Sequence, residues 1–395
     1  MLKRASFGSF KTLSQVEVDL SAFTLLVGKN GAGKTSVLQG IHLASLVGVR
    51  QPGEEQRLDG RLGLLFRESN HPRRFVTAST RGPVRLALTD QEECTLSVVA
   101  SLPESDRGWG EDDCRFDVSV AKAPALRELT LPSDDRQHRQ AFLDSAEVRG
   151  FGSAVLLRLD AEPMSQPSIM PTISDQEAPR LERNGAGLAS VLNYFAGAEP
   201  DTLAAITRDL KSVVPEVRGI RTFPTTVALR GYERIVIGDQ AVNRPYQTDV
   251  PAHRFSLDMG AGRLIPADLL SEGTVLTLGL LAVLRHPSCP KVVLADDIDR
   301  ALHPEAQADL VRCLRAIQRE RPEVQIICTT HSPYLLDHVG LDEVRVMALD
   351  EQGHTRCRPL SEHPESQRWR EMLRTGEFWA SVGDDWVKEP HQGGA

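Results

Sequence analysis

The sequence predicts an α/β fold with a parallel core sheet that is split along the chain and carries an antiparallel β lobe and an inserted helical and β arm. Residues 23–47 read as a strand, a glycine-rich turn and a helix in succession. After Pro266 helices and strands alternate again, as in a parallel sheet. Between about Arg73 and Val120, short alternating apolar runs separated by polar turns indicate antiparallel strands.

The core elements follow from their apolar runs. Residues 23–27 are β-branched and apolar and end at a glycine, which predicts a buried strand before the helix at 33–47. The second piece predicts a helix at 272–284, a strand at 291–294, a helix at 304–320, a strand at 324–328 and a helix from Pro333.

The middle of the chain predicts the lobe and the arm. Antiparallel strands are expected at 84–88, 94–99 and 116–120, helices at 186–195 and 201–214, and short strands at 235–237 and 255–257. Asp201 or Thr202 is expected to cap the second helix. Residues 103–113 and 161–187 are rich in Pro, Gly, Ser and acidic side chains and read as surface loops. The predicted domains are a core of residues 1–50 and 264–348, an antiparallel lobe and insertion at 51–160, a helical or mixed arm or lid at 161–263, and a C-terminal cap at 349–395.

Charge and composition exclude several classes. A formal net charge of -8 is not that of a protein drawn indiscriminately to nucleic acid or anionic lipid. The N-terminus lacks a signal-peptide pattern, and the longest apolar stretch, at 275–284, is far below the about 20 residues that span a bilayer. We therefore expect a cytoplasmic protein without a membrane partner. Six cysteines without a CxxC pair read as core residues and not as disulfides or zinc ligands.

Residues 28–35, GKNGAGKT, fit the pattern G-x-x-x-x-G-K-[ST] and are called the phosphate loop below. Its glycines let backbone N–H groups converge on a phosphate, Lys34 reaches the β- and γ-phosphate oxygens, and the Thr35 hydroxyl binds Mg²⁺. The alternative, a simple glycine-rich turn, is disfavoured by the strand before it and the helix after it. The predicted nucleotide-binding residues here are Gly28, Lys29, Asn30, Gly31, Ala32, Gly33, Lys34, Thr35 and Ser36.

Polar side chains also end two later strands. Asp296 and Asp297 follow residues 292–295, and His331 follows the next strand. In an open parallel sheet ligands bind at that edge, so Asp296 is expected to hold Mg²⁺, Asp297 to face the attacking water and His331 to contact the γ-phosphate. The catalytic residues are thus predicted to be Asp297, His331 and Lys34, and the metal ligands Thr35 and Asp296. Read in isolation, paired aspartates would indicate a turn and the histidine a solvated loop.

Residues 270–274, LSEGT, open an apolar helix and are called the signature segment. Ser271 can cap that helix, while the N–H groups of its first turn form an anion site. Without the other three segments this would be no more than a good helix start.

Together the four segments resemble the ABC-type ATPase heads of the SMC, RecF and OLD families, a P-loop NTPase class that includes stand-alone bacterial AAA-like ATPases. The resemblance covers residues 1–48 and 264–348, with a weaker match at 184–195. It implies ATP and Mg²⁺ as cofactors. It also implies that Ser271 and Gly273 contact the γ-phosphate on an opposite subunit, giving a head-to-tail homodimer, with higher oligomers left open. Residues 298–304 would face the dimer, residues 7–26 would contact the adenine side, and His331 would be the switch histidine.

Two departures from the family pattern refine this picture. LSEGT stands where transporters usually have LSGGQ, which points away from membrane transport. Asp297 stands where most relatives carry glutamate, so its carboxylate lies about 1.5 Å farther from the water. Because a misplacement near 1 Å costs about a hundredfold in rate, we expect slow hydrolysis. Gln91 is the single candidate for the glutamine that joins such sites to a partner, and it is not assigned.

The expected function is a cytoplasmic ATPase whose ATP-driven dimerisation controls a separate effector, a nuclease or toxin, in anti-phage defence. OLD-type relatives carry a nuclease domain after the head, for which residues 349–395 leave no room. A RecF-like repair ATPase is the alternative if the arginines from Arg50 to Arg85 bind DNA, although interleaved acids favour a solvated mixed-charge face. A transporter subunit and a scaffold that holds ATP without turnover are the remaining readings.

Overall fold

The computed structural model describes residues 1–48, 83–101, 115–122, 127–130, 141–169, 178–237, 240–369 and 372–388. These fall into two compact units. The first unit holds residues 1–156, 290–299 and 318–395, and the second holds 157–289 and 300–317.

The first unit contains an antiparallel sheet of six strands in the order β2-β1-β4-β5-β6-β7. Its bounds are β1 Leu2–Phe10, β2 Leu13–Asp19, β4 Val84–Asp90, β5 Cys94–Ser101, β6 Arg115–Lys122 and β7 Arg127–Thr130. Side chains alternate between buried and less buried along β5, as the period of a strand with one covered face requires. The three antiparallel strands expected from the sequence are confirmed as β4, β5 and β6.

The first unit also contains the core sheet, in the order β16-β15-β3-β14-β13-β8. Its bounds are β3 Phe23–Gly28, β8 Ala154–Leu157, β13 Val292–Ala295, β14 Gln325–Thr329, β15 Val344–Leu349 and β16 Thr355–Pro359. β13, β14, β3 and β15 run parallel, and β3 and β14 are buried along their whole length, which explains their unbroken apolar runs. The predicted α/β fold with a split parallel core is confirmed, because β3 pairs with a strand 303 residues later: Phe23 pairs with Ile326.

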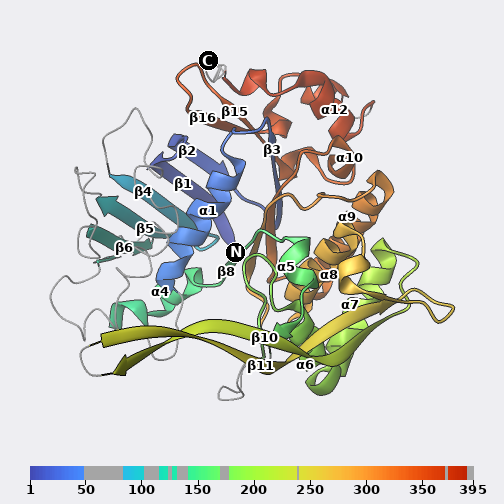
Figure 1. The fold of residues 1–395 in the computed structure, drawn as a ribbon. Helices are drawn as coiled ribbons and strands as arrows, with labels where there is room; N and C mark the ends of the chain where they lie inside the picture. Colours follow the sequence, from blue (N-terminus) through green and yellow to red (C-terminus); the bar gives the residue numbers. More distant parts are fainter. Residues whose placement is uncertain are drawn as a thin grey trace. The chain divides into compact units, whose positions relative to one another are not determined.

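Helix α1, Lys34–Ser45, joins the two sheets into one core. Its buried Val37, Leu38 and Ile41 belong to a cluster that includes side chains of both sheets. Figure 1 shows the α1 ribbon beside β1 and β4. Gly40 allows α1 to approach β1 closely, since a Cβ there would lie 2.5 Å from the Phe7 ring. A 3₁₀ turn, η1 Leu46–Gly48, follows, and α4 spans Ala146–Phe151. The phosphate loop is therefore held by a strand and a helix that are both anchored in the core.

Short elements close the first unit after β14. They are α10 Pro333–Leu336, η5 Leu341–Glu343, η6 Leu360–Glu362, α11 Ser366–Trp369, α12 Thr375–Val382 and η7 Asp385–Lys388. Phe378 and Trp386 are buried, so the C-terminal aromatics pack within the unit. Gly376 is required where α12 meets α10, because a Cβ there would lie 1.8 Å from the Pro333 carbonyl oxygen. The helix expected from Pro333 is only one turn long.

The second unit combines helices with a twisted ribbon. Its helices are α5 Ala161–Ser165, α6 Leu188–Ala198, α7 Pro200–Val213, η4 Ala267–Leu269, α8 Glu272–Arg285 and α9 Pro304–Glu320, of which the last three residues belong to the first unit. Its strands are β9 Ser168–Ile169, β10 Gly219–Ile237, β11 Gln240–Asp258 and β12 Leu264–Pro266, with β11 central. A buried ion pair, Arg285 Nε to Asp209 Oδ2 at 2.5 Å, joins α8 to α7.

Two expectations for this unit were wrong in extent, and one was wrong outright. The short strands at 235–237 and 255–257 are parts of a hairpin whose strands each have 19 residues. Residues 161–187 are not all loop, because α5 and β9 lie among them and Met164 is fully buried. Helix α7 begins at Pro200 after Glu199, which makes no side-chain cap, so neither Asp201 nor Thr202 caps it. Proline is favoured at the first helical position because its φ is already helical, and the helix therefore begins one residue before Asp201.

No helix among the described residues is long and apolar enough to cross a membrane.

A candidate nucleotide-binding site

The phosphate loop connects β3 to α1 through three glycines with positive φ, at Gly28 (141°), Gly31 (81°) and Gly33 (97°). Two of them also lie against neighbouring atoms. A Cβ at Gly28 would lie 2.1 Å from the Met347 carbonyl oxygen, and one at Gly33 would lie 2.5 Å from the Thr355 hydroxyl. Only glycine satisfies both the conformation and the space. Ala32 is buried under the loop, Lys29 and Asn30 are exposed, and Ser36 is half-buried in the first turn of α1.

Lys34 is buried beneath the loop. Its Nζ donates to the carbonyl oxygens of Gly28 at 2.8 Å and Lys29 at 3.1 Å. Burial lowers the pKa of this ammonium, while the negative charges of Asp297, Asp296 and others raise it. The loop thus holds a poorly solvated cation, which a phosphate would stabilise.

Asp296 directly follows β13, and its carboxylate contacts Thr35 at the end of the phosphate loop. The Thr35 hydroxyl lies 3.0 Å from Asp296 Oδ1 and 3.1 Å from Oδ2, although the two residues are 261 positions apart. A hydroxyl and a carboxylate are the oxygen donors that Mg²⁺ prefers, so the pair fits that ion. The structure therefore brings together the two residues predicted as metal ligands.

Asp297 and His331 lie at the same edge of the sheet and are both exposed. Asp297 has a left-handed backbone with φ of 51°. Its N–H donates to the Thr329 hydroxyl at 2.7 Å, on the strand that precedes His331. The charge of Asp297 also acts on Lys34, which places this carboxylate near the phosphate loop.

Two acidic residues near this edge were missed from the sequence. Burial raises the pKa of the Asp299 carboxyl, against a hydrogen bond from Thr330 that lowers it, and Asp299 Oδ1 has no hydrogen-bond partner among the described residues. Asp384 accepts a hydrogen bond from the Lys29 N–H at 3.1 Å and one from Trp379 Nε1 at 2.8 Å. The C-terminal cap thereby contacts the phosphate loop. Asp384 and Lys29 are 355 positions apart, so no local sequence pattern could predict this contact.

The signature segment lies in the second unit. Ser271 is exposed and caps α8, accepting a hydrogen bond from the Thr274 N–H at 3.3 Å. Gly273 is buried in the first turn, where a Cβ would lie 2.4 Å from the Ala301 carbonyl oxygen. The glycine is thus explained first by close packing of α8 against the loop at residues 300–302.

Gly273→Ala is expected to destabilise the protein by about 1–3 kcal/mol, since backbone atoms cannot move away as a side chain can. Gly197→Ala in α6 is the matched control, because a Cβ there has nothing within 4 Å. Gly197 is exposed and is the second-to-last residue of α6, so the change is expected to alter stability by less than about 0.5 kcal/mol. Thermal unfolding of both variants checks the pair, and equal unfolding temperatures would contradict the packing role of Gly273.

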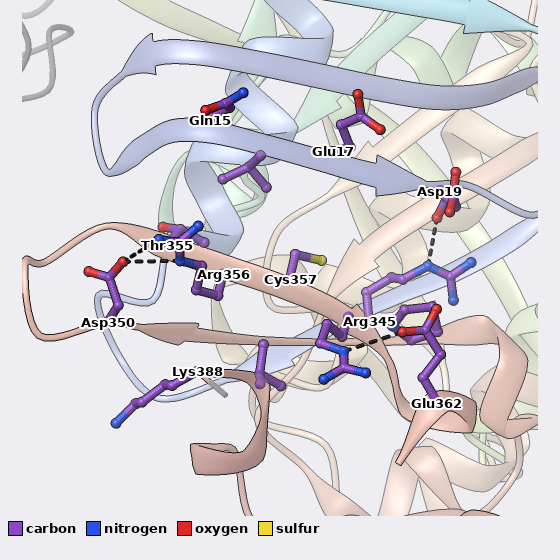
Figure 2. A pocket seen from close by; sticks show the side chains of 14 residues that line it. Gln15, Glu17, Asp19, Arg345, Asp350, Thr355, Arg356, Cys357, Glu362 and Lys388 are labelled. Carbon is purple, nitrogen blue, oxygen red and sulfur yellow. Dashed lines mark hydrogen bonds and ion pairs between the residues drawn. The ribbon is translucent and has the colours of Figure 1, made fainter. Parts of the chain in front are cut away.

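A pocket of about 510 Å³ opens between β2 and the β15–β16 hairpin (Figure 2). Four of its charged side chains form two ion pairs, Arg356 with Asp350 at 2.9 Å and Arg358 with Glu362 at 3.3 Å. Thr355 joins the pocket to the phosphate loop, since its hydroxyl lies 3.0 Å from the Ala32 carbonyl oxygen. We assign this pocket no ligand.

The arginine stretch proposed as a DNA contact lies outside the described residues from Arg50 to Arg81, and Arg85 is exposed on β4. Gln91 lies in the turn between β4 and β5. Neither observation bears on DNA binding or on the unassigned glutamine.

A phosphate loop on a parallel sheet, with a threonine and an aspartate facing each other, is the arrangement of a P-loop NTPase. The chain belongs to the family described as "AAA domain, putative AbiEii toxin, Type IV TA system", which matches residues 23–337. This confirms the resemblance to P-loop ATPase heads expected from the sequence.

Other similarities are more distant. The "Septu protein PtuA" of Bacillus thuringiensis is 33% identical over 69 residues, which are 18% of this chain and 17% of that protein. The match therefore spans less than a fifth of that relative's length. Among solved structures, an SMC head bound to the C-terminal winged-helix domain of ScpA covers 90% of this chain and 96% of its own, with 13% identity and a TM-score of 0.46. The SMC head domain of Thermotoga maritima covers 91% and 98%, with 13% identity and a TM-score of 0.44.

Proposed function

We propose that the protein binds ATP with Mg²⁺ at the phosphate loop and hydrolyses it slowly. The observation that carries this proposal is the convergence of Lys34, Thr35, Asp296 and Asp297 at one edge of the core sheet, with Thr35 and Asp296 in direct hydrogen-bond contact. Membership of an AAA-domain family supports the same reaction.

Each residue has a distinct task in this proposal. The loop N–H groups and Lys34 would bind the β- and γ-phosphates, while Thr35 and Asp296 would hold Mg²⁺, which would neutralise charge on the phosphate oxygens. Asp297 orients the attacking water and accepts its proton. His331 donates a hydrogen bond to the γ-phosphate. Because Asp297 is one methylene shorter than the usual glutamate, the water is held less closely and turnover is slow.

We further propose that ATP joins two copies of the chain head to tail. Ser271 is exposed at the N-terminus of α8, where first-turn N–H groups and the helix dipole favour an anion. A nucleotide held by one copy would then contact Ser271 and Gly273 of the other. The homodimer, and any higher oligomer built from it, would depend on the γ-phosphate.

The ATP-bound dimer is proposed to control a separate effector, a nuclease or toxin, in anti-phage defence. The family description, which names a toxin and a type IV toxin–antitoxin system, supports an effector, and the short similarity to PtuA points the same way. The alternative is a RecF-like ATPase in genome maintenance, for which the arginine stretch is the relevant feature.

Phosphate release from ATP tests this function. We expect slow, Mg²⁺-dependent turnover that duplex DNA leaves unchanged. Stimulation by DNA that weakens as salt is raised would favour the repair reading, because phosphate contacts release counterions. No Mg²⁺-dependent turnover at all would contradict hydrolysis and leave a nucleotide-binding scaffold.

A further inference from the structure

Thr329, the last residue of β14, has a hydroxyl at the centre of the candidate site. The side chain is fully buried. Its Oγ1 accepts the Asp297 N–H at 2.7 Å and lies 2.7 Å from Asp296 Oδ1, while Asp297 Oδ1 is farther away at 3.4 Å. A hydroxyl has one proton, so at these distances Thr329 donates to Asp296 and accepts from Asp297.

The backbone around Thr329 reinforces the same connection. The Thr329 carbonyl oxygen accepts the Ile298 N–H at 3.2 Å, and the Thr330 N–H donates to the Leu26 carbonyl oxygen at 3.2 Å. Thr329 therefore accepts hydrogen bonds from two successive N–H groups just after β13, and the next residue, Thr330, is hydrogen-bonded to β3 just before the phosphate loop.

From these contacts we propose that Thr329 is a positioning residue, which fixes Asp296 and Asp297 relative to each other and to the loop that carries His331. This inference rests on the proposed ATP hydrolysis for its catalytic consequence. Its metal-binding consequence concerns Asp296 alone.

The backbone conformation of Asp297 explains why its contact with Thr329 matters. A non-glycine residue with φ of 51° is in a sparsely populated conformation, which aspartate tolerates better than most residues. Such a conformation persists when surrounding contacts hold it, and the Thr329 hydroxyl supplies one of them. The direction of the Asp297 carboxylate, proposed to orient the attacking water, thus depends on a left-handed backbone that the Thr329 hydroxyl holds in place.

Thr329→Val tests the inference, because valine keeps the β-branched shape and removes only the hydroxyl. We expect kcat for ATP to fall about 10- to 100-fold, as when a hydrogen-bond partner of a metal ligand is removed, with KM changed less than about threefold. We also expect the Mg²⁺ concentration for half-maximal binding of a fluorescent ATP analogue to rise about tenfold. Thr329→Ser, which keeps the hydroxyl, is expected to stay within about threefold of the wild type in both measurements.

Thr24→Val separates positioning from stability. Thr24 is also fully buried in the core sheet, and its hydroxyl bonds Ser21 at the opposite end of β3 from the phosphate loop. We expect it to lower the unfolding temperature without altering kcat or the Mg²⁺ requirement. If Thr329→Val behaves like Thr24→Val, Thr329 is structural only and the inference is wrong. If the wild type hydrolyses no ATP, the proposed function fails, while the Mg²⁺ titration still decides whether Thr329 positions Asp296.

Discussion

Lys34→Ala is expected to remove nearly all ATP binding, with a loss on the order of a hundredfold or more in kcat/KM. The side chain is buried, its Nζ lies under the phosphate loop, and burial has already removed much of its hydration. A phosphate would replace that lost hydration with a direct charge interaction, whereas alanine leaves the β- and γ-phosphates without a cation from the loop. Titration with a fluorescent ATP analogue measures the effect directly.

The loss must not arise from unfolding. Lys34→Ala removes an ammonium that burial disfavours, so the unfolding temperature without nucleotide is expected to change little. ATP and Mg²⁺ should raise the unfolding temperature of the wild type and not that of the variant. Lys291→Ala, at an exposed lysine just before β13, is the control and should bind ATP normally. Normal ATP binding by Lys34→Ala would refute the assigned phosphate site.

Asp297→Asn is expected to lower kcat about a hundredfold or more while ATP binding remains. An amide cannot accept the proton of the attacking water, and asparagine has nearly the shape of aspartate. It also tolerates the left-handed backbone that the structure shows at this position, with φ of 51°. The variant should therefore fold normally and bind ATP but hydrolyse it very slowly.

Steady-state phosphate release and nucleotide binding, measured on the same preparation, check this result. Turnover by Asp297→Asn at the wild-type rate would remove Asp297 from the mechanism. Asp297→Glu completes the comparison, since it restores the usual methylene. If the short side chain of Asp297 limits hydrolysis, the longer glutamate is expected to raise turnover about tenfold. This is expected even though a glutamate with a left-handed backbone costs about 1–2 kcal/mol of stability.

The parts of the site that are local in sequence could be predicted. The phosphate loop, the two aspartates after a buried strand and the capped signature helix each carry their own pattern of residue types. Parallel strands then bring the phosphate loop and the aspartates to one edge of the core sheet, and the structure does place Thr35 against Asp296. Helix α9 begins and ends where the periodicity predicts, at Pro304 and Glu320.

The parts of the site that depend on tertiary contacts could not be predicted from the sequence. Thr329 looks like an ordinary strand residue until β13 and β14 are paired, and Asp384 meets Lys29 only once the C-terminal cap has packed. The hairpin of β10 and β11 was missed for another reason. Between about residues 226 and 249 its described side chains are mostly exposed, so the strands lack the buried face that produces an alternating pattern.

The central claim is that ATP joins two copies, and the mass of the protein in solution tests it most directly. With ATP and Mg²⁺, the wild type is expected to shift from one chain to two, and Lys34→Ala to stay a single chain. Ser271→Arg removes an exposed helix cap, which is expected to cost about 1 kcal/mol of helix stability. This variant is expected to bind ATP and yet remain a single chain. A wild type that stays monomeric with saturating ATP and Mg²⁺, or a Ser271→Arg variant that dimerises like it, would contradict the account.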